Sequence, residues 1–166
     1  IVTGGDSGIG RAAAIALSRE GADLVLSYLP SEQEDAEEVR DLLEGEGRRA
    51  VLVPGDISDE QYCKDLVQKA VDELGGLDTL VMVAGRMKSN DDILTLTTED
   101  IDSPIKTNVY SLFWLTQAAI PHLEPGSSIV TTGSVQGTQP SPDKIDYALT
   151  KGAIGVFTAG LAQQLA

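Results

Sequence analysis

The chain has few of the residues that build disulfides or metal sites. One cysteine, Cys63, and one histidine, His122, occur among its 166 residues. A single cysteine cannot form an internal disulfide, and one residue of each kind gives no credible zinc ligand set. We therefore expect no metal site, a packing role for Cys63 and a surface position for His122.

Basic residues and long apolar runs are also scarce. Twelve basic and 26 acidic side chains give a formal net charge of -14, which repels nucleic-acid phosphates and anionic lipid. No apolar run approaches the length of a membrane span, and no signal-peptide pattern opens the chain. We expect a cytoplasmic protein with neither nucleic acid nor membrane as partner, folded as one domain over residues 1–166.

Short β-branched segments alternate with longer amphipathic ones. This alternation predicts an α/β fold, a doubly wound parallel sheet whose ligands bind at the carboxyl ends of its strands. Ser31 and Ser58 are the expected N-caps of the second and third helices. The predicted strands are 1–3, 22–28, 50–53, 77–83 and 128–132. The predicted helices are 8–20, 32–46, 59–74, 98–123 and 143–166.

A glycine-rich loop, T-G-G-D-S-G-I-G, joins the first strand to the first helix. Glycines permit a tight turn that brings backbone N–H groups against a pyrophosphate at the positive end of a helix dipole. A plain glycine turn is the alternative, but the strand-to-helix position favours nucleotide binding. The residues expected to bind there are Gly4, Asp6, Ser7, Gly8, Ile9 and Gly10.

A tyrosine and a lysine stand one helical turn apart in the last predicted helix. Tyr147 and Lys151 are four positions apart in I-D-Y-A-L-T-K-G-A, so they project from one face. Alone, such a pair is typical of any surface helix. A free phenol has a pKa of about 10, and a nearby ammonium favours its ionised form.

The loop Gly4-x-x-x-Gly8-x-Gly10, the Y-x-x-x-K pair and Ser134, 13 positions before the tyrosine, together resemble the short-chain dehydrogenase/reductase family. The stretches S-Y-L-P-S-E-Q-E-D-A and S-V-Q-G-T-Q-P-S-P are similar to its bacterial general-stress and glucose-dehydrogenase-like oxidoreductases. The resemblance covers the whole chain. It implies a Rossmann fold and NAD(P)-dependent hydride transfer between a nicotinamide and a carbonyl or alcohol.

The same resemblance implies roles for four side chains. Tyr147 is expected to be the general acid and base, and Lys151 to favour its ionised form and bind the nicotinamide ribose. Ser134 is expected to donate a hydrogen bond to the reacting oxygen. Asn108, in K-T-N-V-Y, is expected to hold a water that connects the lysine to solvent. Without the motif, Ser134 is an ordinary loop serine and Asn108 a helix kink or cap.

Further cofactor contacts are implied after the third and fourth strands. Asp56, followed by Ile57, matches the adenine-contacting aspartate of the family. Ala84 and Gly85 match backbone that packs against the cofactor. The family has N-N-A-G here, whereas this chain reads M-V-A-G. Loss of both asparagines, at 82–83, puts the local sheet geometry in doubt.

The second strand bears on the choice of nicotinamide cofactor. An acidic residue about 20 positions beyond the glycine loop selects NAD, and counting from Gly8 reaches Tyr28 instead. Ser27 and Tyr28 can donate to a 2′-phosphate, and Arg11 can approach it. NADP is therefore favoured over NAD, and both stay open.

An alternative to the enzyme is a nucleotide-binding scaffold or sensor that keeps the fold without chemistry, as the altered M-V-A-G suggests. The presence of all four catalytic positions favours the enzyme. A folded fragment with neither property is a third reading. The resemblance also implies a homodimer or homotetramer, in which Tyr110, Phe113 and Trp114 lie at the interface or in the core.

Neither end of the chain resembles a natural domain boundary. The first strand opens with Ile1 rather than methionine, and the last helix stops at Ala166 without a cap. We expect truncation at both ends, with the C-terminal part that covers the substrate missing. Gln136, Gln139 and Pro140 are expected to line one wall of the substrate pocket.

Overall fold

The sheet has the strand order β3-β2-β1-β4-β5, and every neighbouring pair is parallel. This computed structural model describes residues 1–166. Its strands are β1 (Val2–Thr3), β2 (Leu24–Tyr28), β3 (Ala50–Pro54), β4 (Thr79–Met82) and β5 (Ser128–Thr131). The chain moves outward from β1 to β3 and then returns to pair β4 with β1. The predicted doubly wound sheet is confirmed, and its order reverses between β1 and β4.

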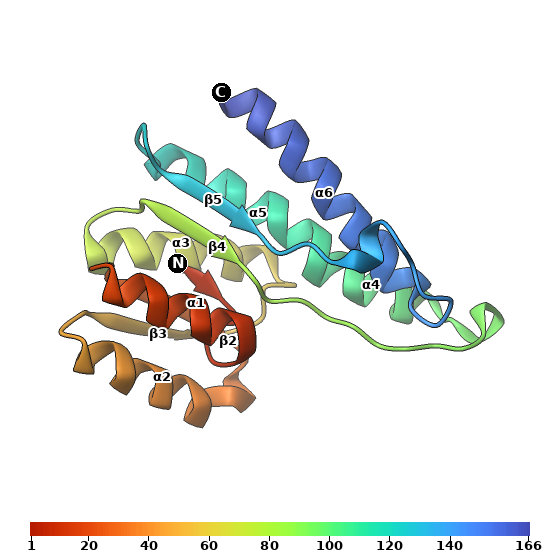
Figure 1. Cartoon of the computed structure of the whole chain (residues 1–166), viewed down its shortest axis with the longest axis horizontal. Helices are drawn as coiled ribbons and strands as arrows, with labels where there is room; N and C mark the ends of the chain where they lie inside the picture. The colour runs from red at the N-terminus through yellow and green to blue at the C-terminus, as the bar shows by residue number, and fades with distance from the viewer.

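Helices cover both faces of the sheet (Figure 1). They are α1 (Gly8–Arg19), α2 (Gln33–Gly45), α3 (Glu60–Leu74), α4 (Thr98–Ile105), α5 (Ser111–Ala119) and α6 (Ile145–Leu165). On one face, Ala14 of α1 and Val39 of α2 pack on β1 and β2. On the other, residues of α3, α5 and α6 share a larger cluster with β4. None of the helices combines the length and hydropathy that crossing a bilayer requires.

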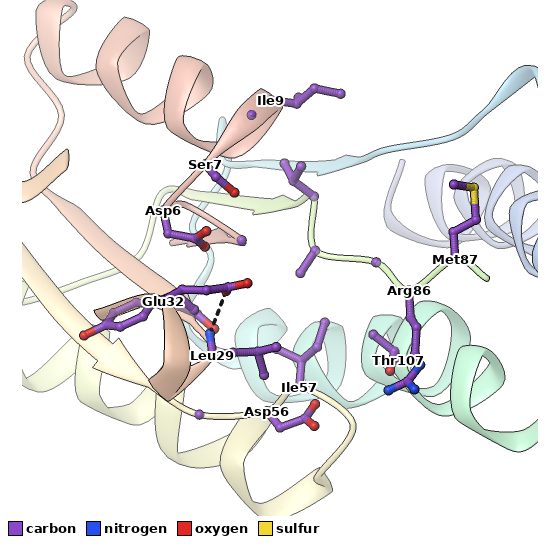
Figure 2. A pocket seen from close by; sticks show the side chains of 18 residues that line it. Asp6, Ser7, Ile9, Leu29, Glu32, Asp56, Ile57, Arg86, Met87 and Thr107 are labelled. Atoms are coloured by element: carbon purple, nitrogen blue, oxygen red, sulfur yellow. Dashed lines mark hydrogen bonds between the residues drawn. The ribbon is translucent and has the colours of Figure 1, made fainter. Parts of the chain in front are cut away.

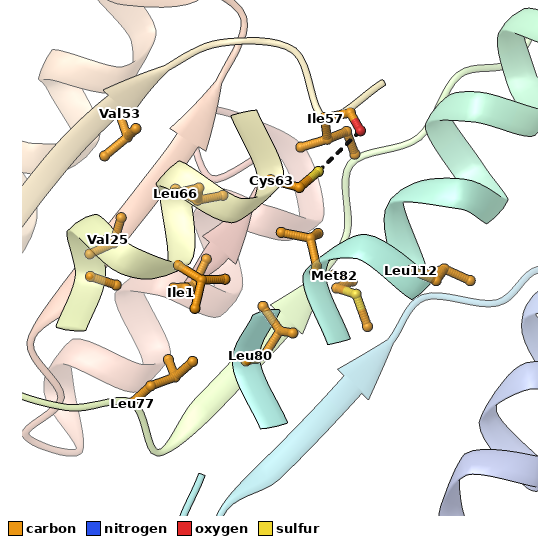
Figure 3. Close-up of a cluster of buried hydrophobic side chains, with 14 of the residues drawn as sticks. Ile1, Val25, Val53, Ile57, Cys63, Leu66, Leu77, Leu80, Met82 and Leu112 are labelled. Atoms are coloured by element: carbon orange, nitrogen blue, oxygen red, sulfur yellow. Dashed lines mark hydrogen bonds between the residues drawn. The ribbon is translucent and has the colours of Figure 1, made fainter. Parts of the chain in front are cut away.

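The larger apolar cluster contains Cys63, as Figure 3 shows. This thiol is fully buried and donates a hydrogen bond to the carbonyl of Ile57 at 3.3 Å. Burial raises the pKa of Cys63 to about 12, so the thiol stays protonated and unreactive at neutral pH. The packing role expected for Cys63 is confirmed. His122 is half-buried in a 3₁₀ turn after α5.

The two predicted N-caps are wrong. Asp59, not Ser58, caps α3, because its carboxylate accepts a hydrogen bond from the backbone N–H of Tyr62 at 2.8 Å. Ser31 lies inside a 3₁₀ turn, Pro30–Glu32, which precedes α2. Proline is pre-set for the first position of a helical turn, so the turn starts at Pro30 and α2 follows without a side-chain cap.

The single helix predicted over 98–123 is interrupted. It consists of α4, a π-helical turn at Lys106–Tyr110, α5 and a final 3₁₀ turn. The N–H of Ser111 reaches back five residues to the carbonyl of Lys106, so the turn holds one residue more than an α-helical turn. Asn108 lies in the middle of this turn and is only 2% exposed. The sequence pattern missed the interruption because π turns keep nearly helical periodicity.

In the M-V-A-G segment, Met82 ends β4 with regular sheet pairing although both asparagines are missing. Thr3, fully buried on β1, accepts hydrogen bonds through its hydroxyl from the N–H groups of Val83 and Ala84 at 3.1 and 3.2 Å. Met82 is buried in the larger apolar cluster and pairs in register with β1 and β5. The threonine hydroxyl therefore supplies a side-chain acceptor at this junction, and β4 pairs regularly up to Met82.

Replacing Thr3 by valine should lower the free energy of unfolding by about 1–3 kcal/mol, because the Val83 N–H loses its acceptor in a partly buried place. Thermal and urea denaturation measure the change. Thr3→Ser keeps the hydroxyl and should retain most of the stability. A stable Thr3→Val beside a destabilised Thr3→Ser would mean that the methyl group, rather than the hydrogen bonds, matters at this position.

Candidate active site

A pocket of about 500 Å³ opens where the carboxyl ends of β1, β2 and β4 meet (Figure 2). This place is the reversal point of the strand order, where open parallel sheets bind ligands. Eleven of the residues predicted to bind cofactor line it: Gly4, Asp6, Ser7, Gly8, Ile9, Ser27, Tyr28, Asp56, Ile57, Ala84 and Gly85.

The glycine loop brings the first turn of α1 against the ends of two strands. A Cβ added to Gly10 would lie 1.8 Å from the carbonyl oxygen of Gly4, so no side chain fits there. Gly4 has a φ of +64°, and a Cβ added to it would lie 3.1 Å from the Cα of Ala84, so the two backbones pack closely. Ser7, the N-cap of α1, makes no side-chain hydrogen bond to the helix. The first N–H groups of α1 are therefore left for a ligand.

At the end of the pocket formed after β2 and β3, the hydroxyl groups proposed as phosphate donors are engaged elsewhere. Ser27 is hydrogen-bonded to the Tyr62 hydroxyl at 2.9 Å, and Tyr28 donates to Gln33 at 2.6 Å. Arg11 forms an ion pair with Glu38 at 2.7 Å. Ser27 and Tyr28 line the pocket, but their hydroxyls are already used within the chain.

Glu32 lines the same end of the pocket and was not among the predicted residues. Its carboxylate points into the hollow in Figure 2 and accepts a long hydrogen bond, 3.3 Å, from the backbone N–H of Leu29. The residue lies in the 3₁₀ turn that directly follows β2. A sequence search that allowed a few residues beyond the end of the strand would have found it.

Tyr147 and Lys151 lie together on α6, as predicted. The ammonium nitrogen of Lys151 is 5.6 Å from the centre of the Tyr147 ring and donates to the carbonyl of Thr132 at 2.8 Å. Burial lowers the pKa of Lys151. The Tyr147 side chain is half-buried, and its hydroxyl makes no hydrogen bond within the chain. A phenol beside a desolvated ammonium is suited to proton transfer.

Asn108 and Lys151 both lie close to Gly85, which lines the pocket. A Cβ added to Gly85 would lie 3.3 Å from the Asn108 Oδ1 and 3.8 Å from the Lys151 Nζ. The Asn108 side chain accepts from the Arg86 N–H at 2.7 Å and donates to the Arg86 carbonyl at 2.9 Å. Its second amide proton is donated to the Thr150 hydroxyl at 3.0 Å. Both amide protons of Asn108 are therefore used in hydrogen bonds within the chain.

Ser134 caps the 3₁₀ turn Val135–Gly137 after β5. Its Oγ accepts from the Gln136 N–H at 3.2 Å, which leaves the hydroxyl proton available for donation. The turn packs directly on α6, since a Cβ at Gly137 would lie 2.8 Å from the backbone of Lys151. Ser134 is thus fixed relative to the helix that carries the tyrosine.

Of the three residues expected to line the substrate pocket, one is hydrogen-bonded within its own loop and two are exposed. Gln136 donates to the Ser141 hydroxyl at 2.8 Å and accepts from the Ser141 N–H at 2.6 Å, so its side chain braces the loop. Gln139 and Pro140 are exposed in that loop.

A pocket at the sheet's reversal point, lined by an uncapped glycine-rich turn, is typical of the α/β folds that bind dinucleotides. The profile of the short chain dehydrogenase family matches residues 1–166, and the chain belongs to that family.

Curated relatives and solved structures agree with this assignment. The chain is 58% identical over 166 residues to the Bacillus subtilis oxidoreductase YhxD, covering all of this chain and 56% of that protein. It is 47% identical to General stress protein 39 of the same species, over 99% of this chain and 57% of that one. The chain therefore spans little more than half the length of these relatives.

A short chain dehydrogenase from Burkholderia cenocepacia, solved in complex with NADP, superposes with a TM-score of 0.94 at 38% identity. The match covers 99% of this chain and 66% of that one. The fold and the expected similarity to bacterial general-stress oxidoreductases are confirmed.

Proposed function

We propose that the protein is an NAD(P)-dependent oxidoreductase that transfers hydride between a nicotinamide and a carbonyl or alcohol. The observation that carries this proposal is the Lys151 ammonium: it lies beside Gly85, which lines the pocket that suits a dinucleotide, and it is 5.6 Å from the centre of the Tyr147 ring. The glycine turn, the uncapped start of α1 and the 500 Å³ volume fit the pyrophosphate of such a cofactor.

The chain's own residues divide the proton chemistry between them. A bound nicotinamide supplies or accepts the hydride. In reduction, Ser134 donates a hydrogen bond to the carbonyl oxygen, and Tyr147 gives its hydroxyl proton to that oxygen. The Lys151 ammonium stabilises the phenolate left behind. In oxidation, the phenolate removes the proton from the alcohol, and the same charge lowers the free energy of the ionised base.

Replacing Tyr147 by phenylalanine should reduce kcat about 10²–10⁴-fold, because it removes the proton donor and leaves the ring. NADPH oxidation with a panel of aldehydes, ketones and sugars measures the loss, and NADPH fluorescence measures binding, which should be unchanged. Tyr110→Phe, at a half-exposed tyrosine outside the pocket, is the matched control.

Saturable cofactor binding by the unsubstituted chain with no turnover of any substrate would instead favour the nucleotide-binding scaffold. A melting temperature that neither NADP(H) nor NAD(H) shifts would favour a folded chain with neither property.

For the cofactor we propose NADP(H), with NAD(H) as a competitor. The Burkholderia structure supports NADP(H), since it holds that cofactor in the same fold. The Glu32 carboxylate favours NAD(H), because it can accept hydrogen bonds from ribose hydroxyls and repels a 2′-phosphate. We infer that Glu32 weakens the preference for NADP(H).

Glu32→Gln should therefore raise the ratio of NADPH to NADH affinity, by about tenfold for a repulsion of about 1.4 kcal/mol. Fluorescence titration with each cofactor measures the ratio. Glu34→Gln, on the exposed first turn of α2, changes the net charge equally and should leave the ratio unaltered. An unchanged ratio in Glu32→Gln would place the carboxylate away from the ribose.

We also propose a homodimer or homotetramer built on α5 and α6. Trp114 packs against the core, whereas Tyr110 and Phe113 remain 48% and 47% exposed. Val156 on α6 is 77% exposed. Such a surface is typical of a protein–protein interface. Light scattering should give a mass of at least two chains, and a monomer at working concentration would refute the proposal.

A further inference from the structure

Thr150, between Tyr147 and Lys151 on α6, forms a side-chain hydrogen bond with Asn108. It is fully buried. Its hydroxyl proton goes to the carbonyl of Tyr147 at 2.7 Å. Its oxygen accepts the Asn108 amide proton at 3.0 Å. A single hydroxyl therefore joins α6 to the π-helical turn.

The hydrogen bonds around this hydroxyl leave only one arrangement. The Arg86 N–H can only donate, so the atom of the Asn108 amide that faces it is the oxygen. The amide nitrogen then faces the Arg86 carbonyl and Thr150. Since the threonine proton is directed to Tyr147, its oxygen is the acceptor for Asn108. The chain of contacts runs from the pocket wall at Arg86 to the backbone of Tyr147.

This connection ties α6 to the pocket wall at Arg86 through Asn108. Lys151 follows Thr150 directly, and its ammonium donates a hydrogen bond to the carbonyl of Thr132 at 2.8 Å. Gly137 packs on the Lys151 backbone without room for a side chain. Loss of the hydroxyl would leave a buried amide proton of Asn108 without an acceptor, and the helix would relax away from the pocket wall.

We propose that Thr150 is a positioning residue for the proton-transfer pair: its hydroxyl holds the Tyr147–Lys151 segment at a fixed distance from Asn108 and the pocket wall. The inference rests on the proposed oxidoreductase function. It adds a side chain that touches neither substrate nor cofactor and acts through Asn108 and the Tyr147 carbonyl.

Thr150→Val, which is nearly isosteric, tests the hydroxyl. We expect kcat for the best substrate of the carbonyl panel to fall about tenfold or more through misplacement of the pair. The acid limb of the pH–rate profile should also move. Thr150→Ser should restore both values. Thr116→Val is the matched control, because Thr116 is also buried but its hydroxyl has no hydrogen-bond partner.

A second measurement does not depend on turnover. In protein labelled with ¹³C-lysine, NMR titration follows the Lys151 amine, assigned through Lys151→Met. Burial lowers the pKa of Lys151, so a helix released from the wall lets water in and moves the midpoint up, towards that of an exposed lysine. Thr150→Ser and Thr116→Val should leave the midpoint in place.

The possible results separate the two proposals. The positioning role is overturned if Thr150→Val changes kcat and the Lys151 midpoint no more than Thr116→Val does. It is also overturned if Thr150→Ser lowers kcat as much as Thr150→Val. If the unsubstituted protein turns over no carbonyl, the oxidoreductase proposal fails and the Lys151 titration alone decides the role of Thr150. If circular dichroism shows that Thr150→Val does not fold, Thr150→Ala takes its place, because it removes the hydroxyl without introducing a second methyl group.

Discussion

The close approach of Gly10 to the Gly4 carbonyl is the constraint on which the site depends. With no room for a Cβ at Gly10, the first turn of α1 packs directly on the turn that leaves β1. This contact aims unpaired backbone N–H groups at the point where the strand order reverses. The packing of Gly4 on Ala84, and the pocket that both residues line, follow from that backbone contact.

The net charge of -14 gives the chain an overall negative potential, against which the N–H groups of α1 act locally. An acidic protein repels an anionic cofactor at long range, so local positive potential has to come from fixed groups. The dipole and N–H groups of α1 provide part of it. Lys151 provides another part, and burial keeps its charge poorly hydrated and its effect on nearby groups strong. Asp6 and Glu32 in the pocket wall act in the opposite direction.

Much of the fold and site could be read from the sequence because the signals were local. The glycine spacing, the strand-to-helix junctions and the four-residue interval from Tyr147 to Lys151 each depend on neighbouring residues. Other features depended on remote partners. The Thr3 hydroxyl accepts from the backbone N–H of Val83 from a strand 80 positions away, and the π-helical turn around Asn108 follows no pattern in its own residues. The hydroxyls of Ser27 and Tyr28 were assigned to a ligand, whereas Tyr62 and Gln33 engage them.

The sequence by itself determined the doubly wound class, the place of the glycine turn and the common helical face of Tyr147 and Lys151, because periodicity and short spacings specify local backbone geometry. Only the tertiary structure decided which polar groups remain available to a ligand. A hydroxyl or carboxylate is free or engaged according to what the fold places within 3 Å of it. Packing therefore leaves Glu32 facing the pocket, ties Arg11 to Glu38 and commits Thr150 to Asn108.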